Sequence, residues 1–364
     1  MKIVIAAWHL KDFNVGIGRY CRGLIGGLGQ IDQENDYHIL LPKHFSQLPK
    51  FPNIHYHVIS IPIFKRRVWE QIASLLVGPY DVLHFPYDSV VACKRGKFVV
   101  TIHDVKPLIF NALRPDFGWN SLIQRLIIPD QKTQVDQVIT VSECSRRDIV
   151  ERLGFPPERI SVVYPGIDRG QFCPASTEPA ESGSRPYILC VAGSDPTKNV
   201  ETLVEAFGRL PRPLRNAYDL MLAGDMRRRI DIRERVGQLG IDAQTRFIGV
   251  VDEAQLVTLY QRATVFVFPS RYEGFGLPVL EAMACGCPVI SSNASSLPEV
   301  VGEAALLANP SDAGEFLDQL VRVLTDQRLR QSLREKGLER AAWFSWEGMA
   351  RETVRVYQQL CMEI

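Results

Sequence analysis

Residues 263–299 constrain the fold more than any other stretch of the chain. The stretch opens with a short apolar run, Val265 to Phe268, of the kind found in strands buried on both faces. A loop with two glycines follows, then Pro278 favours the start of a helix and Gly286 favours its end. Another apolar run begins at Val289. We expect a strand, a loop, a helix and a second strand of a parallel sheet, with the loop at the edge where such sheets bind ligands.

Two carboxylates occupy fixed places in this unit. Glu273 lies on the loop, and Glu281 follows eight residues later inside the helix. The free N–H groups at the start of the helix favour a phosphate, and carboxylates can hold hydroxyl groups. Together they suit a sugar attached to a nucleotide. For each acid alone an ordinary interpretation stays open, because Glu273 fits a solvated loop and Glu281 fits a helix start favoured by the helix dipole.

The stretch as a whole, with Glu273 and Glu281 in an E-x7-E arrangement, resembles the signature of retaining glycosyltransferases with the GT-B fold. Among these it is most similar to the bacterial group 1 enzymes that transfer mannose in polysaccharide synthesis. The resemblance covers nearly the whole chain. It implies an α/β fold with GT-B architecture, in which two Rossmann-like domains with parallel sheets face each other across an inter-domain cleft.

The chain has 364 residues, which fits two domains of common size. Residues 169–185 are rich in Pro, Ser, Gly and Glu, as in a linker. The resemblance makes residues 1–168 an acceptor-side Rossmann-like domain, completed by a returning C-terminal helix over 346–364. It makes residues 186–345 the Rossmann-like domain that binds the nucleotide sugar.

In the first domain, the residues of interest follow two predicted strands. Gly16 and Gly18 lie in a loop after the first strand, where the resemblance implies contact with the donor diphosphate, although Val15 replaces a glycine of the family pattern. A plain strand-to-helix turn is the alternative. His103 ends a later strand and is followed by Asp104. The resemblance places His103 beside the anomeric carbon, and we expect Asp104 to orient its ring.

In the second domain, Lys198 stands just before a predicted helix, where it adds to the positive field of the helix start. The resemblance assigns it to the donor phosphates, and a plain surface lysine is the alternative. Many family members carry an arginine where this chain has Ser194 or Thr197, so Arg19 or Arg271 is a candidate replacement.

The resemblance then gives each site residue a role. His103, Glu273 and Lys198 are the expected catalytic residues, with Glu273 holding sugar hydroxyls. Glu281 is expected to hold the ribose of the donor nucleotide, and Val250 lies in a segment expected to contact its nucleobase. The full set expected to bind the donor is Gly16, Gly18, Lys198, Val250, Phe275, Gly276, Leu277 and Glu281.

The chemistry expected from this site needs no metal and no cofactor besides the donor, because no D-x-D motif occurs in the chain. We expect GDP-mannose to be the donor, with a UDP-sugar as the alternative. The acceptor is expected to be a saccharide or a lipid-linked saccharide. Two rival functions use the same residues: an epimerase or hydrolase with Glu273 and Glu281 as paired acids, and a non-catalytic sensor of sugar nucleotides.

Residues 64–77 predict an amphipathic helix that starts with Lys65, Arg66 and Arg67 and carries Trp69 and Leu76 on one face. It suits either loose contact with an anionic membrane or ordinary packing on a core.

The net charge of the chain is +1, which argues against a nucleic-acid partner. The chain shows no signal peptide and no membrane-spanning run, so we expect a cytoplasmic protein, with peripheral contact at the inner face of the membrane left open.

Overall fold

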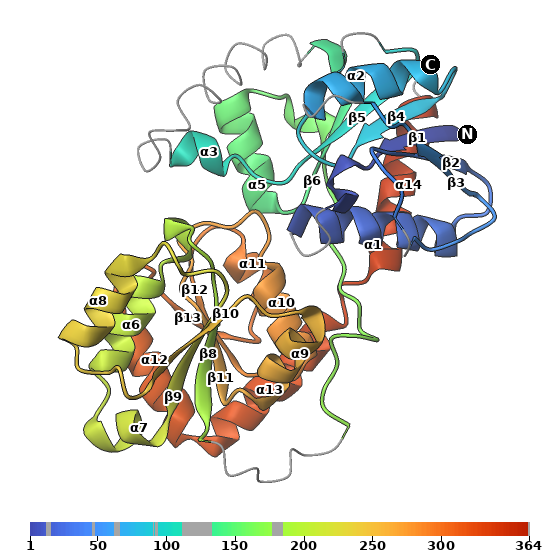
Figure 1. Cartoon of the computed structure of the whole chain (residues 1–364). Coiled ribbons are helices and arrows are strands. Elements are labelled where there is room, and N and C mark those ends of the chain that lie inside the picture. Colours follow the sequence, from blue (N-terminus) through green and yellow to red (C-terminus); the bar gives the residue numbers. More distant parts are fainter. Residues whose placement is uncertain are drawn as a thin grey trace. The chain divides into compact units, whose positions relative to one another are not determined.

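The computed structural model describes residues 1–11, 16–45, 48–61, 66–89, 91, 94–110, 133–176 and 185–362. The chain forms two compact units, shown in Figure 1. Unit 1 comprises Met1–Gly166 and Phe344–Ile364, and unit 2 comprises Ile167–Trp343.

Unit 1 contains a parallel seven-stranded sheet in the order β3-β2-β1-β4-β5-β6-β7. Its strands are β1 (Lys2–Ala6), β2 (Asp36–Leu41), β3 (Ile54–Val58), β4 (Val82–Phe85), β5 (Lys97–Ile102), β6 (Gln137–Thr140) and β7 (Ile160–Val162). Its helices are α1 (Gly16–Ile31), α2 (Arg66–Leu76), α3 (Lys106–Ile109), α5 (Glu143–Asp148) and α14 (Trp346–Met362). Short helical turns cover Trp8–Lys11, Ile149–Leu153 and Pro157–Arg159. The apolar strands are buried on both faces because helices cover the sheet on each side (Figure 1).

Unit 2 contains a parallel six-stranded sheet in the order β10-β9-β8-β11-β12-β13. Its strands are β8 (Tyr187–Val191), β9 (Asp219–Ala223), β10 (Thr245–Gly249), β11 (Val265–Phe268), β12 (Val289–Ser292) and β13 (Leu306–Ala308). Its helices are α6 (Val200–Gly208), α7 (Arg212–Ala217), α8 (Ile230–Gln238), α9 (Glu253–Arg262), α10 (Leu277–Ala284), α11 (Leu297–Val301), α12 (Ala313–Thr325) and α13 (Gln327–Ala341). A single turn of 3-10 helix, Pro196–Lys198, precedes α6.

The elements expected from local sequence signals are present. The apolar run 265–268 is β11, and α10 carries Pro278 in its first turn. Gly286 follows that helix with φ of 73°, a conformation that favours glycine. The hydroxyl of Ser345 accepts the N–H of Gly348 at 3.0 Å and caps α14. The predicted α/β architecture with two Rossmann-like, parallel-sheet units is therefore confirmed.

Helix α14 comes from the far end of the chain and packs on α1 in unit 1, as Figure 1 shows. The contact is close because α1 presents glycines there. A Cβ atom on Gly23 would lie 2.2 Å from the ring of Trp346, and one on Gly27 would lie 2.5 Å from the Trp346 carbonyl oxygen. Any side chain at these two positions would push the helices apart.

The structure corrects part of the prediction for the basic helix. Trp69 is buried as expected, and Ala73 is buried too, but Leu76, placed on the same face as Trp69 by its spacing, is 66% exposed near the end of α2. Val15 and Lys65 lie outside the described residues. In the part of the chain that the structure describes, no helix has both the length and the apolar content of a membrane span.

Candidate functional site

The centre of the site in unit 2 is an ion pair between two loops. Strands β8 and β11 are neighbours in the sheet, so the loops that leave their carboxyl ends meet. Nζ of Lys198, on the β8 loop, lies 2.7 Å from Oε1 of Glu273, on the β11 loop. The side chains are 22% and 13% exposed. Ser270 also donates its hydroxyl to Oε1 of Glu273, at 2.5 Å. The structure thus brings two of the predicted catalytic residues into direct contact.

Two serines hold the backbone of the Glu273 loop in place. The Ser295 hydroxyl accepts the N–H of Glu273 at 2.8 Å. The Ser296 hydroxyl lies 2.9 Å from the carbonyl oxygen of Glu273 and 2.7 Å from that of Phe275. Sequence reasoning did not identify these serines. The only signal was a run of small polar residues after β12, which is ordinary loop composition.

The loop enters α10 through a backbone turn that requires glycine. Gly276 has φ of 115°, and a Cβ atom there would lie 2.6 Å from the Leu297 side chain. Phe275 just before it is buried. Leu277 is the first residue of α10, so its N–H has no partner within the helix. This geometry puts a helix start next to the Glu273 loop, as the sequence predicted.

Glu281 has a different environment from Glu273. Its side chain is 3% exposed, and Oε2 accepts the hydroxyl of Tyr260, on α9, at 3.2 Å. The two acids of the E-x7-E pattern therefore have separate partners, one a cation and the other a phenol. Tyr260 is a further site residue that the sequence did not reveal, because a tyrosine inside an amphipathic helix looks like core.

The candidate replacement cation in unit 2, Arg271, is tied to the Lys198 loop through its backbone. The N–H of Arg271 donates to the Thr197 carbonyl at 2.8 Å, which ties the two loops together. The Arg271 guanidinium lies 3.3 Å from Glu201 and is 41% exposed. Val250 follows β10 and is 75% exposed. The other candidate, Arg19, belongs to α1 in unit 1.

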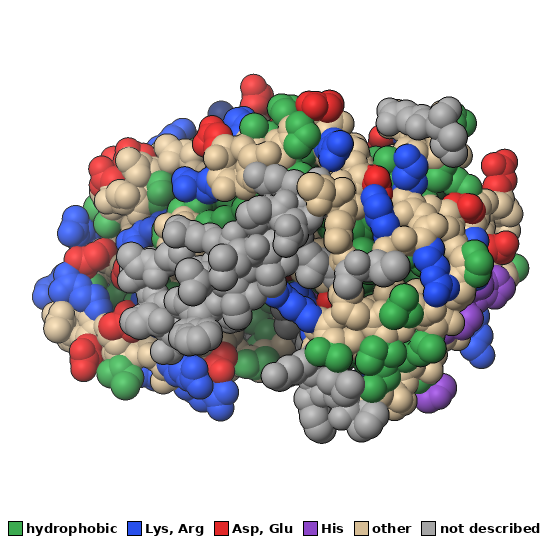
Figure 2. Space-filling model, turned by 90° about the horizontal axis from the view of Figure 1, so that it is seen from above, with side chains coloured by type: hydrophobic (Ala, Val, Ile, Leu, Met, Phe, Trp, Pro, Cys, Tyr) green, Lys and Arg blue, Asp and Glu red, His purple; other side chains and the backbone are tan. Residues whose placement is uncertain are grey.

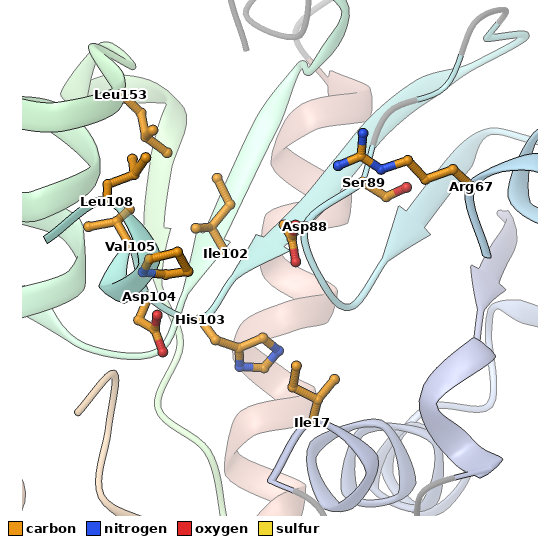
Figure 3. Close-up of a pocket in the computed structure, with 11 residues that line it drawn as sticks. Ile17, Arg67, Asp88, Ser89, Ile102, His103, Asp104, Val105, Leu108 and Leu153 are labelled. Atoms are coloured by element: carbon orange, nitrogen blue, oxygen red, sulfur yellow. The ribbon is translucent and has the colours of Figure 1, made fainter. Parts of the chain in front are cut away.

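Unit 1 has its own pocket of about 240 Å³ around His103 (Figure 3). The lining residues are Ile17, Arg67, Asp88, Ser89, Ile102, His103, Asp104, Val105, Pro107, Leu108 and Leu153. Figure 3 shows the His103 ring turned toward Ile17 of α1, and Arg67 reaching over Ser89. Gly16 and Gly18 lie in the first turn of α1, and a Cβ atom on Gly16 would meet nothing within 4 Å.

The orientation of His103 differs from the expectation. Its Nε2 donates to the carbonyl oxygen of Pro86 at 3.0 Å, so Nε2 carries a proton. The Asp104 carboxylate accepts the N–H of Lys106, at 2.9 Å. The hydrogen bond that orients the His103 ring is the one that it donates to the Pro86 carbonyl. Burial lowers the pKa of His103, while the Pro86 bond and the charge of Asp104 oppose that shift. The ring is therefore neutral at pH 7.

The basic start of α2 divides into two parts. Nε of Arg66 lies 3.3 Å from the buried Glu70, and the Arg66 guanidinium is also 5.0 Å from the Tyr87 ring centre. Arg66 is thus part of the framework of unit 1. Arg67 has no hydrogen bond or ion pair among the described residues and faces the pocket. Within the same described ranges, no group of three or more His, Cys, Asp or Glu residues is placed to hold a metal ion.

Comparison with known proteins identifies the family of the chain. Residues 16–171 match the family model described as Glycosyltransferase Family 4, and residues 175–340 match Glycosyl transferases group 1. An O-antigen chain mannosyltransferase B from Escherichia coli is 30% identical, over 99% of this chain and 100% of the relative.

Solved structures share the fold at lower identity. A sucrose-phosphate synthase from Thermosynechococcus elongatus has a TM-score of 0.79 at 22% identity and covers 99% of both chains. HepE from Anabaena, solved with UDP and glucose, has a TM-score of 0.75 at 17% identity and covers 98% of this chain and 99% of its own. On sequence and fold together, the chain belongs to the glycosyltransferases with the GT-B architecture, built from a Family 4 half and a group 1 half.

Proposed function

We propose that this glycosyltransferase transfers mannose from GDP-mannose, with retention and without a metal ion, to a saccharide or lipid-linked saccharide of a cell-surface polysaccharide. The observation that carries the proposal is the pair of Lys198 and Glu273 at the carboxyl edge of the unit 2 sheet. One partner suits a phosphate and the other suits sugar hydroxyls. The choice of mannose is supported by the mannosyltransferase from Escherichia coli that is similar over the whole chain.

Unit 2 would bind the donor. Lys198 and the first N–H groups of α10 would stabilise the diphosphate as it leaves, since donors aimed at developing charge usually supply the largest catalytic term. Arg271 is our choice for the second cation, because its backbone is bonded to the Lys198 loop. Glu281 would hold the ribose, and exposed Val250 would lie against the base.

The proposed reaction needs no enzyme nucleophile. The bond between the anomeric carbon and the diphosphate oxygen breaks, and an acceptor oxygen forms the new bond on the same face of the sugar. The acceptor's proton passes to the departing phosphate oxygen. Glu273 would hold ring hydroxyls during this step. Neutral His103 would act at the sugar and acceptor end, with Nε2–H fixed on Pro86.

Unit 1 would bind the acceptor, and its pocket around His103 is the candidate site. The volume of about 240 Å³ is below the usual range of roughly 300–1,000 Å³ for pockets that take drug-sized ligands, so it suits one sugar ring rather than a whole chain. An exposed apolar strip on α2, formed by Val68, Leu75 and Leu76, would give loose contact with the membrane that carries a lipid-linked acceptor. Figure 2 shows hydrophobic side chains gathered beside Lys and Arg side chains on the face seen there.

A thermal-shift series with GDP and UDP tests the donor, because a ligand that binds the folded state raises the melting temperature. We expect GDP to stabilise the protein more than UDP, and the product from GDP-mannose to keep the anomeric configuration of the donor. The competing candidate is a UDP-sugar donor, favoured by the likeness to HepE, which was solved with UDP and glucose. If UDP stabilised the protein and GDP did not, a UDP-sugar would replace GDP-mannose as the proposed donor. Product of inverted configuration would overturn the retaining mechanism.

A further inference from the structure

A chain of buried polar contacts crosses the core of unit 1. The Tyr357 hydroxyl, on α14, lies 2.5 Å from Nδ1 of His84, on β4. Nε2 of His84 lies 2.9 Å from the Thr101 hydroxyl, on β5, which is 3.4 Å from the Tyr20 hydroxyl, on α1. All four side chains are at most 1% exposed. The contacts connect the returning C-terminal helix to the first helix of the chain.

This chain of contacts ends at His103. The Tyr20 and His103 rings form a T-shaped pair, with 4.7 Å between ring centres and 86° between ring planes. The Pro86 carbonyl that accepts the His103 proton follows β4, two residues after His84. His103 itself lies two residues after Thr101. Tyr20 and the Pro86 carbonyl, which both contact the His103 ring, are therefore attached to a helix and a strand that the buried contacts join.

The polar side chains need an explanation because burial of such groups is costly. Replacing buried ion pairs by apolar side chains of the same volume is often neutral or stabilising, whereas a fully satisfied polar network fixes one arrangement of the core. Burial lowers the pKa of His84 to about 3, so the ring stays neutral. A neutral imidazole donates from one nitrogen and accepts at the other, and the Tyr357 and Thr101 hydroxyls can fill either role.

The position of α14 is itself closely defined, because Trp346 packs against the bare backbone of Gly23 on α1. We infer that Tyr20 and Tyr357 are positioning residues for His103, and that the C-terminal helix sets the orientation of this imidazole through His84 and Thr101. The inference rests on the proposed role of His103 at the reacting sugar. It adds residues remote from the pocket to the set that determines the rate of transfer.

Tyr20→Phe and Tyr357→Phe test the inference, since each removes one hydroxyl and keeps the ring. Tyr37→Phe is the matched control, because Tyr37 is also fully buried in unit 1 and its hydroxyl donates to Asp32 rather than to His84 or Thr101. The first readout is the NMR spectrum of the full chain labelled with ¹³C on the ring Cε1 of its seven histidines. A His103→Ala spectrum assigns the His103 signal. The second readout is kcat and donor KM with GDP-mannose and acceptor.

We expect both test variants to shift the His103 signal and to lower kcat by roughly tenfold to a hundredfold, the range for small errors of positioning, with donor KM unchanged. The control should change neither the signal nor kcat. An unmoved His103 signal in Tyr357→Phe would overturn the inference, and this readout needs no substrate. The His103 signal could move in the test variants while His103→Ala kept full activity. That result would reject the proposed role of His103 in transfer, and therefore also a catalytic effect of Tyr20 and Tyr357 through His103.

Discussion

Nζ of Lys198 lies 2.7 Å from Oε1 of Glu273, although the two residues are 75 positions apart in the chain. The contact joins the loop after β8 to the loop after β11, and each side chain is largely shielded from water. In the proposed reaction a phosphate takes over the cation and a sugar hydroxyl takes over the carboxylate. In that proposal the ion pair holds both groups in place at the point where the donor's sugar would join its diphosphate.

The first prediction concerns Lys198. Replacing it with alanine should lower kcat by roughly 10²–10³, or about 2.7–4 kcal/mol, as for a lost donor to a developing anion. GDP affinity should fall as well, because the phosphate is also bound before reaction. Lys94→Ala is the matched control, since Lys94 forms an ion pair of the same length with Asp136 in unit 1. Wild-type kcat and nucleotide affinity in Lys198→Ala would place the phosphate elsewhere.

The second prediction concerns Glu281. Glu281→Ala should mainly raise the donor KM, because the ribose changes little between ground state and transition state. A lost hydrogen bond to a charged group is worth about 1.5–3 kcal/mol, so we expect a rise of roughly tenfold to a hundredfold. Tyr260→Phe should act in the same direction more weakly, since it frees Oε2 of Glu281 from a 3.2 Å bond. A fall in kcat with unchanged KM would move Glu281 to the reacting centre.

The third prediction is that catalysis needs no divalent ion. Turnover measured in excess EDTA should equal turnover with added magnesium, because Lys198, Arg271 and the start of α10 would neutralise the diphosphate. A parallel assay with a metal-dependent transferase in the same buffers shows that chelation is complete. Activity that disappears with EDTA and returns with magnesium would contradict the proposal.

The fourth prediction uses two glycines of α1. Gly23→Ala should destabilise the protein by about 1–3 kcal/mol, because its methyl group would overlap the Trp346 ring and core overpacking costs about that much. Gly26→Ala is the control on the same helix, where a Cβ atom meets nothing within 4 Å. It should be neutral or stabilise by about 0.5–1 kcal/mol, since alanine favours the helix. Thermal and urea unfolding measure both, and equal effects would exclude close packing as the cause.

The fifth prediction concerns membrane contact through α2. Leu75→Ser with Leu76→Ser should weaken binding to vesicles that contain anionic lipid, because these leucines are 45% and 66% exposed. Arg67→Glu should weaken vesicle binding at low salt, and the difference from wild type should shrink as the salt concentration rises. Arg66 is a poor choice for charge reversal, since it is paired with buried Glu70. Ile230→Ser, on an exposed position of unit 2, is the control. Absence of vesicle binding at low salt would leave α2 with a packing role alone.

Local signals in the sequence were sufficient for most of the fold. The apolar run of β11, Pro278 at the start of α10 and Gly286 after its end depend only on nearby residues, and all three are as predicted. The family resemblance then named Lys198 and Glu273. The sequence did not predict the ion pair between these two residues, because that contact depends on β8 and β11 being neighbours in the sheet.

Other features of the site depend on packing that no local pattern encodes. Tyr260, Ser295 and Ser296 are common residues in common settings, and only the fold brings them to Glu281 and Glu273. Asp104 was expected beside the His103 ring because it is next in sequence. Strand β5 ends at Ile102, and the Pro86 carbonyl, just after the neighbouring strand β4, accepts the hydrogen bond from His103.

The place of α14 in unit 1 also affects how the protein is made. Domains generally fold as they leave the ribosome, with the N-terminal one first. Here the ribosome must translate all of unit 2 before residues 346–362 can cover α1 and join His84, so the unit that is begun first is completed last. Until then the face of α1 around Gly23 and Gly27 lacks the helix that packs on it.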